Sequence, residues 1–204
     1  MKFFVTGIST DVGKTIASAI ITEALKADYW KPVQAGDLEN SDSIKVRKLT
    51  ASGIVVHPEA YKLNTPASPH VAAAIDNINI VSNNIIEPNT DNHLVIEGAG
   101  GLFVPLNDRE CIIDLIQSDY KVVVVSRHYL GSINHTMLTI EALKQRKLNL
   151  AGIIFSGDKN EATESFILQN SGIRFIGRID NEPYFDRHVI AEYAENFRDM
   201  LNAD

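Results

Sequence analysis

Residues 7–15 read Gly-Ile-Ser-Thr-Asp-Val-Gly-Lys-Thr, between a short apolar run and a segment of helical period. Glycines let the backbone bend so that successive amides converge on an anion at the N-terminus of the following helix. In such a turn the Lys14 ammonium reaches β- and γ-phosphate oxygens, and the Thr15 hydroxyl ligates Mg²⁺. Because Gly-Lys-Thr alone is a common string, its place between an apolar run and a helix carries the prediction of phosphate binding.

The spacing of the two glycines separates this turn from several related ones. The usual P-loop has four residues between its glycines, whereas Gly7 and Gly13 enclose five. A partition-type ATPase carries an additional lysine early in the loop, and none lies between these glycines. The chain also lacks the N-K-x-D string of GTPases and the G-x-G-x-x-G spacing of dinucleotide sites. We therefore expect an ATP-using P-loop enzyme, with a partition-type nucleotide switch as the alternative.

Outward from this turn, apolar β-branched runs alternate with segments of helical period. The expected strands are Phe3–Thr6, Tyr29–Val33, His93–Glu97, Val122–Ser126, Gly152–Phe155 and Phe175–Gly177. The expected helices are Lys14–Lys26, Ser41–Ser52, Ile112–Gln117, Ile133–Arg146, Glu161–Gln169 and a closing segment from Tyr184 to Leu201. Residues 54–92, rich in Asn and Pro, are expected to be loop with one short helix. The alternation predicts an α/β fold, a P-loop NTPase-like three-layer sandwich whose mostly parallel sheet carries helices on both faces, in one domain over residues 1–204.

Composition excludes several classes of function. The chain has 204 residues with a net charge of −7 and a pI near 5.3, so no basic face for a nucleic acid is expected. Its one cysteine, Cys111, allows no internal disulfide and forms no zinc-spaced cluster. The apolar runs are too short to cross a bilayer, and no basic leader precedes the first strand. We expect a cytoplasmic protein without a membrane partner.

Charged residues lie where the other expected strands end. Lys31 is either a surface lysine on an edge strand or a fixed cation facing a developing anion. Glu97, followed by Gly-Ala-Gly-Gly, is either a solvated strand end or a metal ligand above the sheet. Asp42 opens a helix and would favour the helix dipole even without a ligand. Since Mg²⁺ prefers oxygen donors and keeps several waters, Thr15, Asp42 and Glu97 make a plausible partial shell.

The segment Gly131-Ser132-Ile133-Asn134 opens the helix after the fourth expected strand. Ser132 is predicted as its N-cap, and free amides there would hold a carboxylate. Capping alone also explains Ser132, so a ligand role needs further support.

Taken together, these strings resemble the dethiobiotin synthetase family over residues 1–155. The strings that carry the resemblance are Val5-Thr6-Gly7, Val12-Gly13-Lys14-Thr15, Lys31-Pro32-Val33, Ser68-Pro69-His70, Glu97-Gly98-Ala99-Gly100-Gly101 and Gly131-Ser132-Ile133-Asn134-His135. The resemblance implies a cyclo-ligase that uses ATP and Mg²⁺ to join CO₂ or bicarbonate to 7,8-diaminopelargonic acid. It also implies a homodimer whose substrate sites lie at the subunit interface. A cobyrinate-amidating P-loop ligase would need an attached glutaminase with a nucleophilic cysteine, for which this chain has no room.

The resemblance also implies a role for individual residues. Lys14 and Lys31 would be catalytic, flanking the transferring phosphoryl group and the carbamate. Thr15, Asp42 and Glu97 would ligate Mg²⁺, and Gly131, Ser132, Ile133 and Asn134 would bind the substrate's distal carboxylate together with Lys31 at its reacting end. The implied nucleotide-binding residues are Thr10, Asp11, Val12, Gly13, Lys14, Thr15, Glu97, Gly98 and Ser156.

Two positions depart from the family pattern. Many members have Ser where this chain has Ala35, so a hydroxyl contact to the carbamate is missing. Members often present Asn-Asp after the late strand to read adenine, where this chain has Ser156-Gly157-Asp158. A relaxed nucleotide preference is therefore expected. Residues 66–73 resemble the family's loop over the substrate, in which His70 is either structural or catalytic, whereas His128 and His135 are expected to be structural.

Overall fold

The strand that feeds the phosphate-binding turn lies in the middle of a parallel sheet. The computed structural model describes residues 1–202, in which β1 (Lys2–Gly7) pairs with β6 (Leu94–Gly101) on one side and β7 (Lys121–Arg127) on the other. The seven-stranded sheet has the order β4-β2-β6-β1-β7-β8-β9, and each neighbouring pair is parallel. Consecutive β1 residues are buried, as expected for a strand covered on both faces.

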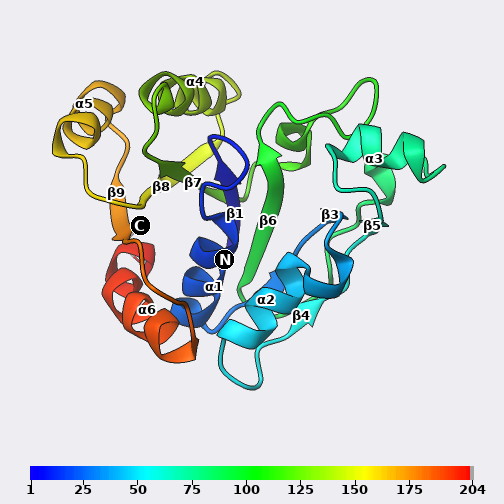
Figure 1. The fold of residues 1–204 in the computed structure, drawn as a ribbon, viewed down its shortest axis with the longest axis horizontal. Helices are drawn as coiled ribbons and strands as arrows, with labels where there is room; N and C mark the ends of the chain where they lie inside the picture. Colours follow the sequence, from blue (N-terminus) through cyan, green and yellow to red (C-terminus); the bar gives the residue numbers. More distant parts are fainter. Residues whose placement is uncertain (203–204) are drawn as a thin grey trace.

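Helices cover both faces of this sheet, so the predicted three-layer sandwich is confirmed (Figure 1). The helices α4 and α5 lie on one face, and α1, α2 and α6 lie on the other. The remaining strands are β2 (Asp28–Trp30), β3 (Val33–Ala35), β4 (Val56–His57), β5 (Tyr61–Leu63), β8 (Asn149–Ser156) and β9 (Phe175–Ile179). The α-helices are α1 (Lys14–Leu25), α2 (Asp42–Leu49), α3 (Pro69–Ile75), α4 (Ser132–Gln145), α5 (Glu161–Ser171) and α6 (Arg187–Asn202).

The closing helix shows how the sequence pattern becomes packing. In α6 the buried residues are Ile190, Ala194, Phe197 and Leu201, spaced by three or four positions and therefore on one face. Phe197 packs directly over Gly177 of β9, where any Cβ would collide with its ring. This packing holds the N-terminus of α6 near the carboxyl ends of the strands, where ligands bind in parallel sheets.

The expected strand Tyr29–Val33 is wrong in its extent, because the chain leaves the main sheet in its middle. β2 ends at Trp30, and β3 begins at Val33 in a separate two-stranded sheet with β5. Pro32, which has no amide hydrogen to donate to a ladder, lies at the break. Its carbonyl oxygen accepts hydrogen bonds from the amides of Ala60 and Tyr61. Lys31 is thereby released from the sheet.

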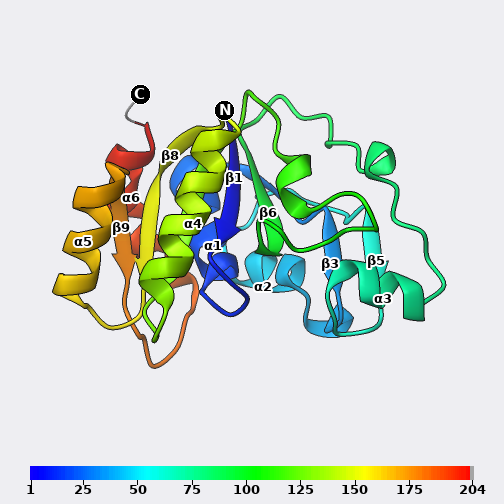
Figure 2. The same cartoon turned by 90° about the horizontal axis from the view of Figure 1, so that it is seen from above.

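Other boundaries also differ from expectation. Residues 54–92 were expected to be loop with one short helix, but they contain the short strands β4 and β5 as well as α3. Figure 2 shows β3, β5 and α3 grouped beside β6. The expected helix Ile112–Gln117 is a single 3₁₀ turn, η3 (Ile112–Leu115), and two further 3₁₀ turns are η1 (Leu38–Asn40) and η2 (Ser82–Asn84). Such short turns lack the length that a periodic pattern needs to show itself.

Within residues 1–202, no helix combines the length and the apolar character needed to span a bilayer.

Candidate active site

The phosphate-binding turn runs from the end of β1 into the first turn of α1. Gly13 is the N-cap of α1 with φ +95°, and a Cβ there would lie 2.8 Å from the Ser156 hydroxyl oxygen. Both the left-handed backbone and the close approach therefore require glycine. Since a glycine has no side chain that could cap the helix, the first backbone amides of α1 are available as hydrogen-bond donors to a ligand.

Lys14 folds back over this turn, where its ammonium donates a hydrogen bond of 2.9 Å to the carbonyl oxygen of Ser9. The residue is 7% exposed. Burial and the charge of nearby Lys31 together lower the pKa of Lys14 to about 8, against the opposing effect of the Glu97 and Asp42 carboxylates. A bound phosphate would favour the charged ammonium, as the predicted role requires.

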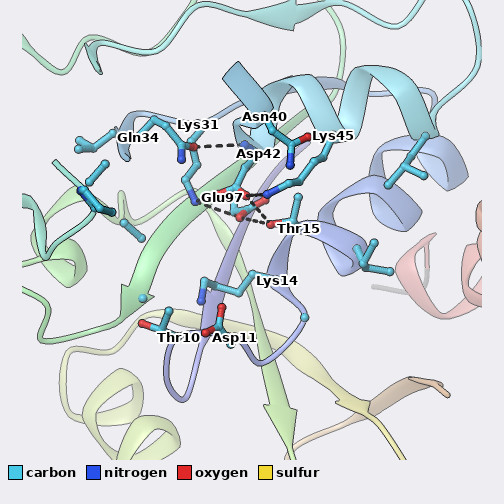
Figure 3. Close-up of a pocket in the computed structure, with 18 of the residues that line it drawn as sticks. Thr10, Asp11, Lys14, Thr15, Lys31, Gln34, Asn40, Asp42, Lys45 and Glu97 are labelled. Carbon is cyan, nitrogen blue, oxygen red and sulfur yellow. Dashed lines mark hydrogen bonds and ion pairs between the residues drawn. The ribbon is translucent and has the colours of Figure 1, made fainter. Parts of the chain in front are cut away.

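Three oxygen donors from three elements converge next to this lysine (Figure 3). The Thr15 hydroxyl oxygen of α1 lies 3.0 Å from Asp42 Oδ1 of α2 and 3.0 Å from Glu97 Oε1 of β6. Glu97 is fully buried, so the alternative of a solvated strand end is wrong. The Ser41 hydroxyl caps α2 by accepting from the Ile44 amide at 3.4 Å, and that cap places Asp42 in the first helical turn.

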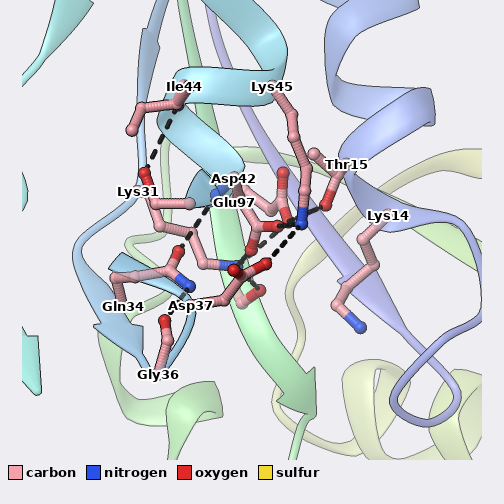
Figure 4. Close-up of polar contacts among 12 residues, drawn as sticks. Lys14, Thr15, Lys31, Gln34, Gly36, Asp37, Asp42, Ile44, Lys45 and Glu97 are labelled. Atoms are coloured by element: carbon pink, nitrogen blue, oxygen red, sulfur yellow. Dashed lines mark hydrogen bonds and ion pairs between the residues drawn. The ribbon is translucent and has the colours of Figure 1, made fainter. Parts of the chain in front are cut away.

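Lys31 completes the cluster from the short connection between β2 and β3 (Figure 4). Its Nζ lies 2.8 Å from Asp42 Oδ2 and 3.0 Å from Glu97 Oε1, and it donates to the Gly98 carbonyl oxygen at 3.1 Å. At 3% exposure it is not a surface lysine, and that alternative is wrong. Burial alone would lower the pKa of Lys31, but the two carboxylates outweigh burial and raise it. Lys31 is therefore held as a cation.

The donor set fits Mg²⁺. Residues 1–202 contain no group of three His, Cys, Asp or Glu side chains that would enclose a metal. Two carboxylates and a hydroxyl instead make a partial shell of hard oxygen donors, which suits an ion that keeps waters and takes phosphate oxygens as further ligands. For Asp42, burial would raise the carboxyl pKa, but Lys31 outweighs it and lowers that pKa, so the carboxylate is charged.

The cluster opens into one large cavity of about 1510 Å³. Single small-molecule sites commonly have about 300–1,000 Å³, so this cavity has room for two ligands. It extends from Ala35 and the loop 66–69 at one end to Arg127 and residues 185–188 at the other. The predicted site residues that line it are Thr10, Asp11, Gly13, Lys14, Thr15, Lys31, Asp42 and Glu97.

Three predicted nucleotide residues lie behind this lining rather than in it. Val12 is 1% exposed and belongs to the apolar core. Gly98 faces Lys31 through its carbonyl oxygen, and Ser156 packs against Gly13. These three positions shape the turn and the lysine, so a role in nucleotide binding stays a prediction.

The far end of the cavity lies at the carboxyl ends of β7, β8 and β9. The Arg127 guanidinium donates a long hydrogen bond of 3.4 Å to Asn181 Oδ1, and the Asn181 amide donates to Asp158 at 2.9 Å. Beneath them, Glu164 of α5 accepts from His128 at 2.8 Å and forms an ion pair with Arg178. His128 therefore contacts a buried carboxylate of α5, which agrees with the structural role expected for it.

The segment Gly131–Asn134 lies apart from this cavity, whose lining in the described chain does not include it. Gly131, with φ +99°, is the N-cap of α4, so the prediction of Ser132 as N-cap is wrong. Ser132 is instead the first helical residue and is 2% exposed. A glycine takes the cap because the turn needs a left-handed backbone there. The two other histidines contact polar neighbours, His70 the Ser68 hydroxyl at 3.1 Å and His135 the Tyr129 hydroxyl at 2.8 Å.

Two residues that pattern reasoning did not single out support the cluster. The Tyr29 hydroxyl donates to Glu97 Oε2 at 2.9 Å, and Gln34 Oε1 accepts from the Asp42 amide at 3.3 Å. Tyr29 stands two positions before Lys31, and that alternation would have placed both side chains on one face of the strand. Gln34 lies beyond the Pro32 break, where no strand pattern points to it.

Comparison with known proteins identifies the family to which this chain belongs. The model of a family described as "AAA domain" matches residues 1–189. The ATP-dependent dethiobiotin synthetase BioD of Christiangramia forsetii is 59% identical over 201 residues, which cover 98% of this chain and 97% of that protein. The chain belongs to the dethiobiotin synthetase family. The relative of the same name in Cytophaga hutchinsonii is 50% identical, over 95% of this chain and 95% of that protein. The one in Chlamydia pneumoniae is 44% identical, over 100% of this chain and 92% of that protein.

Solved structures outside the dethiobiotin synthetase family share only the fold. The septum site-determining protein MinD from Pyrococcus horikoshii, solved with Mg-ADP, superposes with a TM-score of 0.60 at 13% identity, over 98% of this chain and 95% of that one. A chain of the MinC:MinD cell division protein complex from Aquifex aeolicus superposes with a TM-score of 0.56 at 16% identity, over 100% of this chain and 96% of that one. At such identities these likenesses establish a P-loop architecture and leave the function to the site.

Proposed function

We propose that this chain is an ATP-dependent dethiobiotin synthetase acting on 7,8-diaminopelargonic acid and CO₂. The observation that carries the proposal is the meeting of Lys14, Thr15, Lys31, Asp42 and Glu97 at the mouth of the P-loop, in a cavity large enough for two substrates. The identity to dethiobiotin synthetases over nearly the whole chain supports the same activity.

The reaction proceeds in three steps. One amine of the diamine adds to CO₂, which forms a carbamate and releases a proton. A carbamate oxygen then attacks the γ-phosphorus of ATP, the bond to the β,γ-bridging oxygen breaks, and ADP leaves. Finally the second amine loses a proton and attacks the carbonyl carbon, the bond from that carbon to the phosphate oxygen breaks, and the ureido ring closes as phosphate departs.

In this proposal the residues act mainly by placing charge. Phosphoryl transfer needs positioning and stabilisation of negative charge, and preorganised cations supply both. Lys14, bonded over the loop, faces the nucleotide phosphates, while Lys31 faces the carbamate side. Thr15, Asp42 and Glu97 would hold Mg²⁺, which when bound neutralises phosphate charge. The amides of α1 orient the phosphates, and the buried walls exclude water that would otherwise hydrolyse the mixed anhydride.

The proposal includes a homodimer, supported by an apolar surface beside α4. Leu130 is fully exposed, Phe103 is 63% exposed and Leu138 is 61% exposed. A groove of about 410 Å³ beside them is also lined by Ser9 and Thr10 of the P-loop. A second copy seated here would therefore bring its own α4 N-terminus close to the substrate cavity, where Gly131–Asn134 would bind the distal carboxylate. A twofold interface uses the same surface on both subunits.

Release of phosphate tests the activity directly. A coupled assay is expected to show phosphate release only when ATP, Mg²⁺, bicarbonate and the diamine are all present. Equal release without the diamine would instead indicate a nucleotide switch of the MinD type and would remove the proposed reaction.

Mixing two inactive variants tests the shared site. Lys31→Met disables the reacting end, and Asn134→Asp places a negative charge where the distal carboxylate would bind. If each site takes residues from both subunits, one of the two sites in every mixed dimer is intact. Because about half of the dimers in an equal mixture are mixed, co-refolding is expected to recover about a quarter of wild-type activity. No recovery in mixtures shown to be dimeric would mean that each site lies within one subunit.

A further inference from the structure

Tyr29 contacts the Glu97 carboxylate of the oxygen cluster on the side away from the cavity. The residue is fully buried on β2, and its hydroxyl donates to Glu97 Oε2 at 2.9 Å. The other carboxylate oxygen, Oε1, accepts from Thr15 at 3.0 Å and from Lys31 at 3.0 Å. The two oxygens of one side chain are thus divided between a buried side and a cavity side.

The strand register explains this division. Tyr29 of β2 stands opposite Val95 of β6, so Glu97, two residues further along β6, lies diagonally across on the same face. Lys31 lies just beyond the end of β2, in the connection to β3, and its ammonium reaches Oε1. Tyr29 on β2 therefore supplies a neutral donor to Oε2, and Lys31 after the end of that strand supplies a cationic donor to Oε1.

We infer that Tyr29 is a positioning residue that fixes the Glu97 carboxylate so that Oε1 alone faces the metal and phosphate side of the site. This inference rests on the proposed function for the identity of the bound groups. Tyr29 does not line the cavity and does not touch substrate. It acts through Glu97, in the way that outer-shell hydrogen bonds orient the ligands of metals.

The hydrogen bond is needed because the side chain of a glutamate can rotate about its terminal torsion, which is broad. Without the phenol, Oε2 would be a buried charged acceptor without a donor on that side. It would then compete with Oε1 for Lys31 and Thr15, and the carboxylate would turn from its cavity-facing geometry. A neutral donor leaves the negative charge of the carboxylate available to a cation, which a second lysine at position 29 would not.

Metal binding to the ADP complex tests this role without any turnover. We titrate Mn²⁺, a paramagnetic substitute for Mg²⁺, into protein saturated with ADP and measure free Mn²⁺ by electron paramagnetic resonance. Tyr29→Phe is expected to weaken Mn²⁺ binding by about 10–100-fold, as losses of outer-shell partners commonly do. At saturating metal the variant is expected to regain most of its kcat and to keep the KM of the diamine.

The matched control is Tyr120→Phe. Tyr120 is 3% exposed and also donates its phenol to a carboxylate, that of Glu87, but it stands just before the amino end of β7, whereas the oxygen cluster lies towards the carboxyl ends of the strands. Its variant loses an equivalent hydrogen bond and is expected to bind Mn²⁺ as the wild type does. Wild-type affinity in Tyr29→Phe, or equal losses in both variants, would overturn the inference.

A second variant covers the case in which Tyr29→Phe does not fold. In Tyr29→Phe/Glu97→Gln the carboxylate that needs the phenol is itself neutral, so folding is expected to return. If the double variant also fails to fold, Tyr29 serves the core rather than Glu97, and the inference is wrong. Because neither the Mn²⁺ titration nor the folding measurement contains diamine, their outcomes are separate from failure of the proposed synthetase activity.

Discussion

The two ends of the cavity are built differently. At the phosphate end, contacts of 2.8–3.1 Å join side chains from α1, the β2–β3 connection, α2 and β6, and the central pair Lys31 and Glu97 is buried. At the other end, exposed Arg127 reaches Asn181 over 3.4 Å, and only the supporting Glu164 beneath them is buried. The difference shows a closely packed charged cluster at the phosphate end and looser, more exposed contacts at the far end.

The largest expected effect comes from the phosphate end. Lys31→Met keeps the volume of the side chain but removes its charge, so kcat is expected to fall by about 10²–10³-fold, as when one preorganised donor to a developing anion is lost. ATP affinity is expected to change by only a few fold, because Lys14 and the amides of α1 remain. Rapid-quench kinetics and nucleotide titration measure the two quantities separately.

The control for that variant is Lys62→Met on β5, whose lysine side chain is 58% exposed and pairs with Glu59. It is expected to behave as the wild type. An unchanged kcat in Lys31→Met would remove this lysine from the reacting site and erase the contrast between the two ends.

The next effect concerns the support of the far end. Burial would raise the pKa of Glu164, but hydrogen bonds from the Asn160 amide, His128 and Arg178 outweigh it and lower that pKa. A carboxyl group whose folded-state pKa is lowered stabilises the fold above its ordinary value, and this contribution disappears as pH falls through the lowered pKa. Glu164→Gln is therefore expected to cost about 1–3 kcal/mol at pH 7 and progressively less below about pH 4.5.

Urea unfolding at pH 7 and at acid pH measures this loss. Glu161→Gln on the same helix, whose side chain is 82% exposed, is the matched control and is expected to change little at either pH. A loss for Glu164→Gln that is the same at both pH values would show that its charge does not support the far end.

A smaller effect is expected from Arg127→Ala. This guanidinium lines the cavity but lies far along it from the lysines, so it should bind the nucleotide equally in the ground state and the transition state. The KM of ATP is expected to rise by about three- to tenfold with kcat unchanged. This is the result expected when a contact that stabilises the bound ground state and the transition state equally is removed. Arg146→Ala, which removes an exposed arginine paired with Asp114, is the control. A fall in kcat would contradict the division of labour between the ends.

The smallest effect is expected at Ala35, which lines the cavity near the substrate loop. Ala35→Ser restores the hydroxyl common in the family, and one neutral hydrogen bond of about 1 kcal/mol corresponds to roughly a fivefold change at most. We expect the KM of the diamine to fall by about two- to fivefold. A larger gain would mean that the geometry at Ala35 affects binding as strongly as the geometry of the cluster around Glu97.

The same contrast explains what could be predicted from the sequence. Lys14 and Thr15 open the helix after β1, and Glu97 lies towards the carboxyl end of the neighbouring strand β6, so the parallel sheet made their meeting foreseeable. Asp42 and Lys31 were proposed for the site from their residue types, but a helix-opening aspartate and a strand lysine each also have an ordinary explanation, and the family resemblance was what gave them defined roles. Tyr29 was within reach of strand alternation, but nothing in a single strand reveals which neighbour a buried phenol will meet.

The far end could not be predicted because its parts come from loops. Asn181 and residues 185–188 are placed by the packing of α6 on α1 and β9, which depends on contacts between distant segments rather than on a local pattern. The N-cap of α4 was also misassigned, since a serine is the commoner cap and only the backbone angle reveals the need for Gly131. The phosphate-binding turn therefore carries a local signature, whereas the far end of the cavity depends on tertiary packing.

The fate of a labelled oxygen tests the central claim most directly. Turnover with ¹⁸O-bicarbonate and ATP, followed by mass spectrometry of the released phosphate, follows the oxygen that joins carbon to phosphorus. The account predicts that each phosphate gains one oxygen from bicarbonate, because the carbamate attacks the γ-phosphorus and its carbon–oxygen bond breaks at ring closure. Phosphate that takes its new oxygen from water would show simple hydrolysis and would contradict the account.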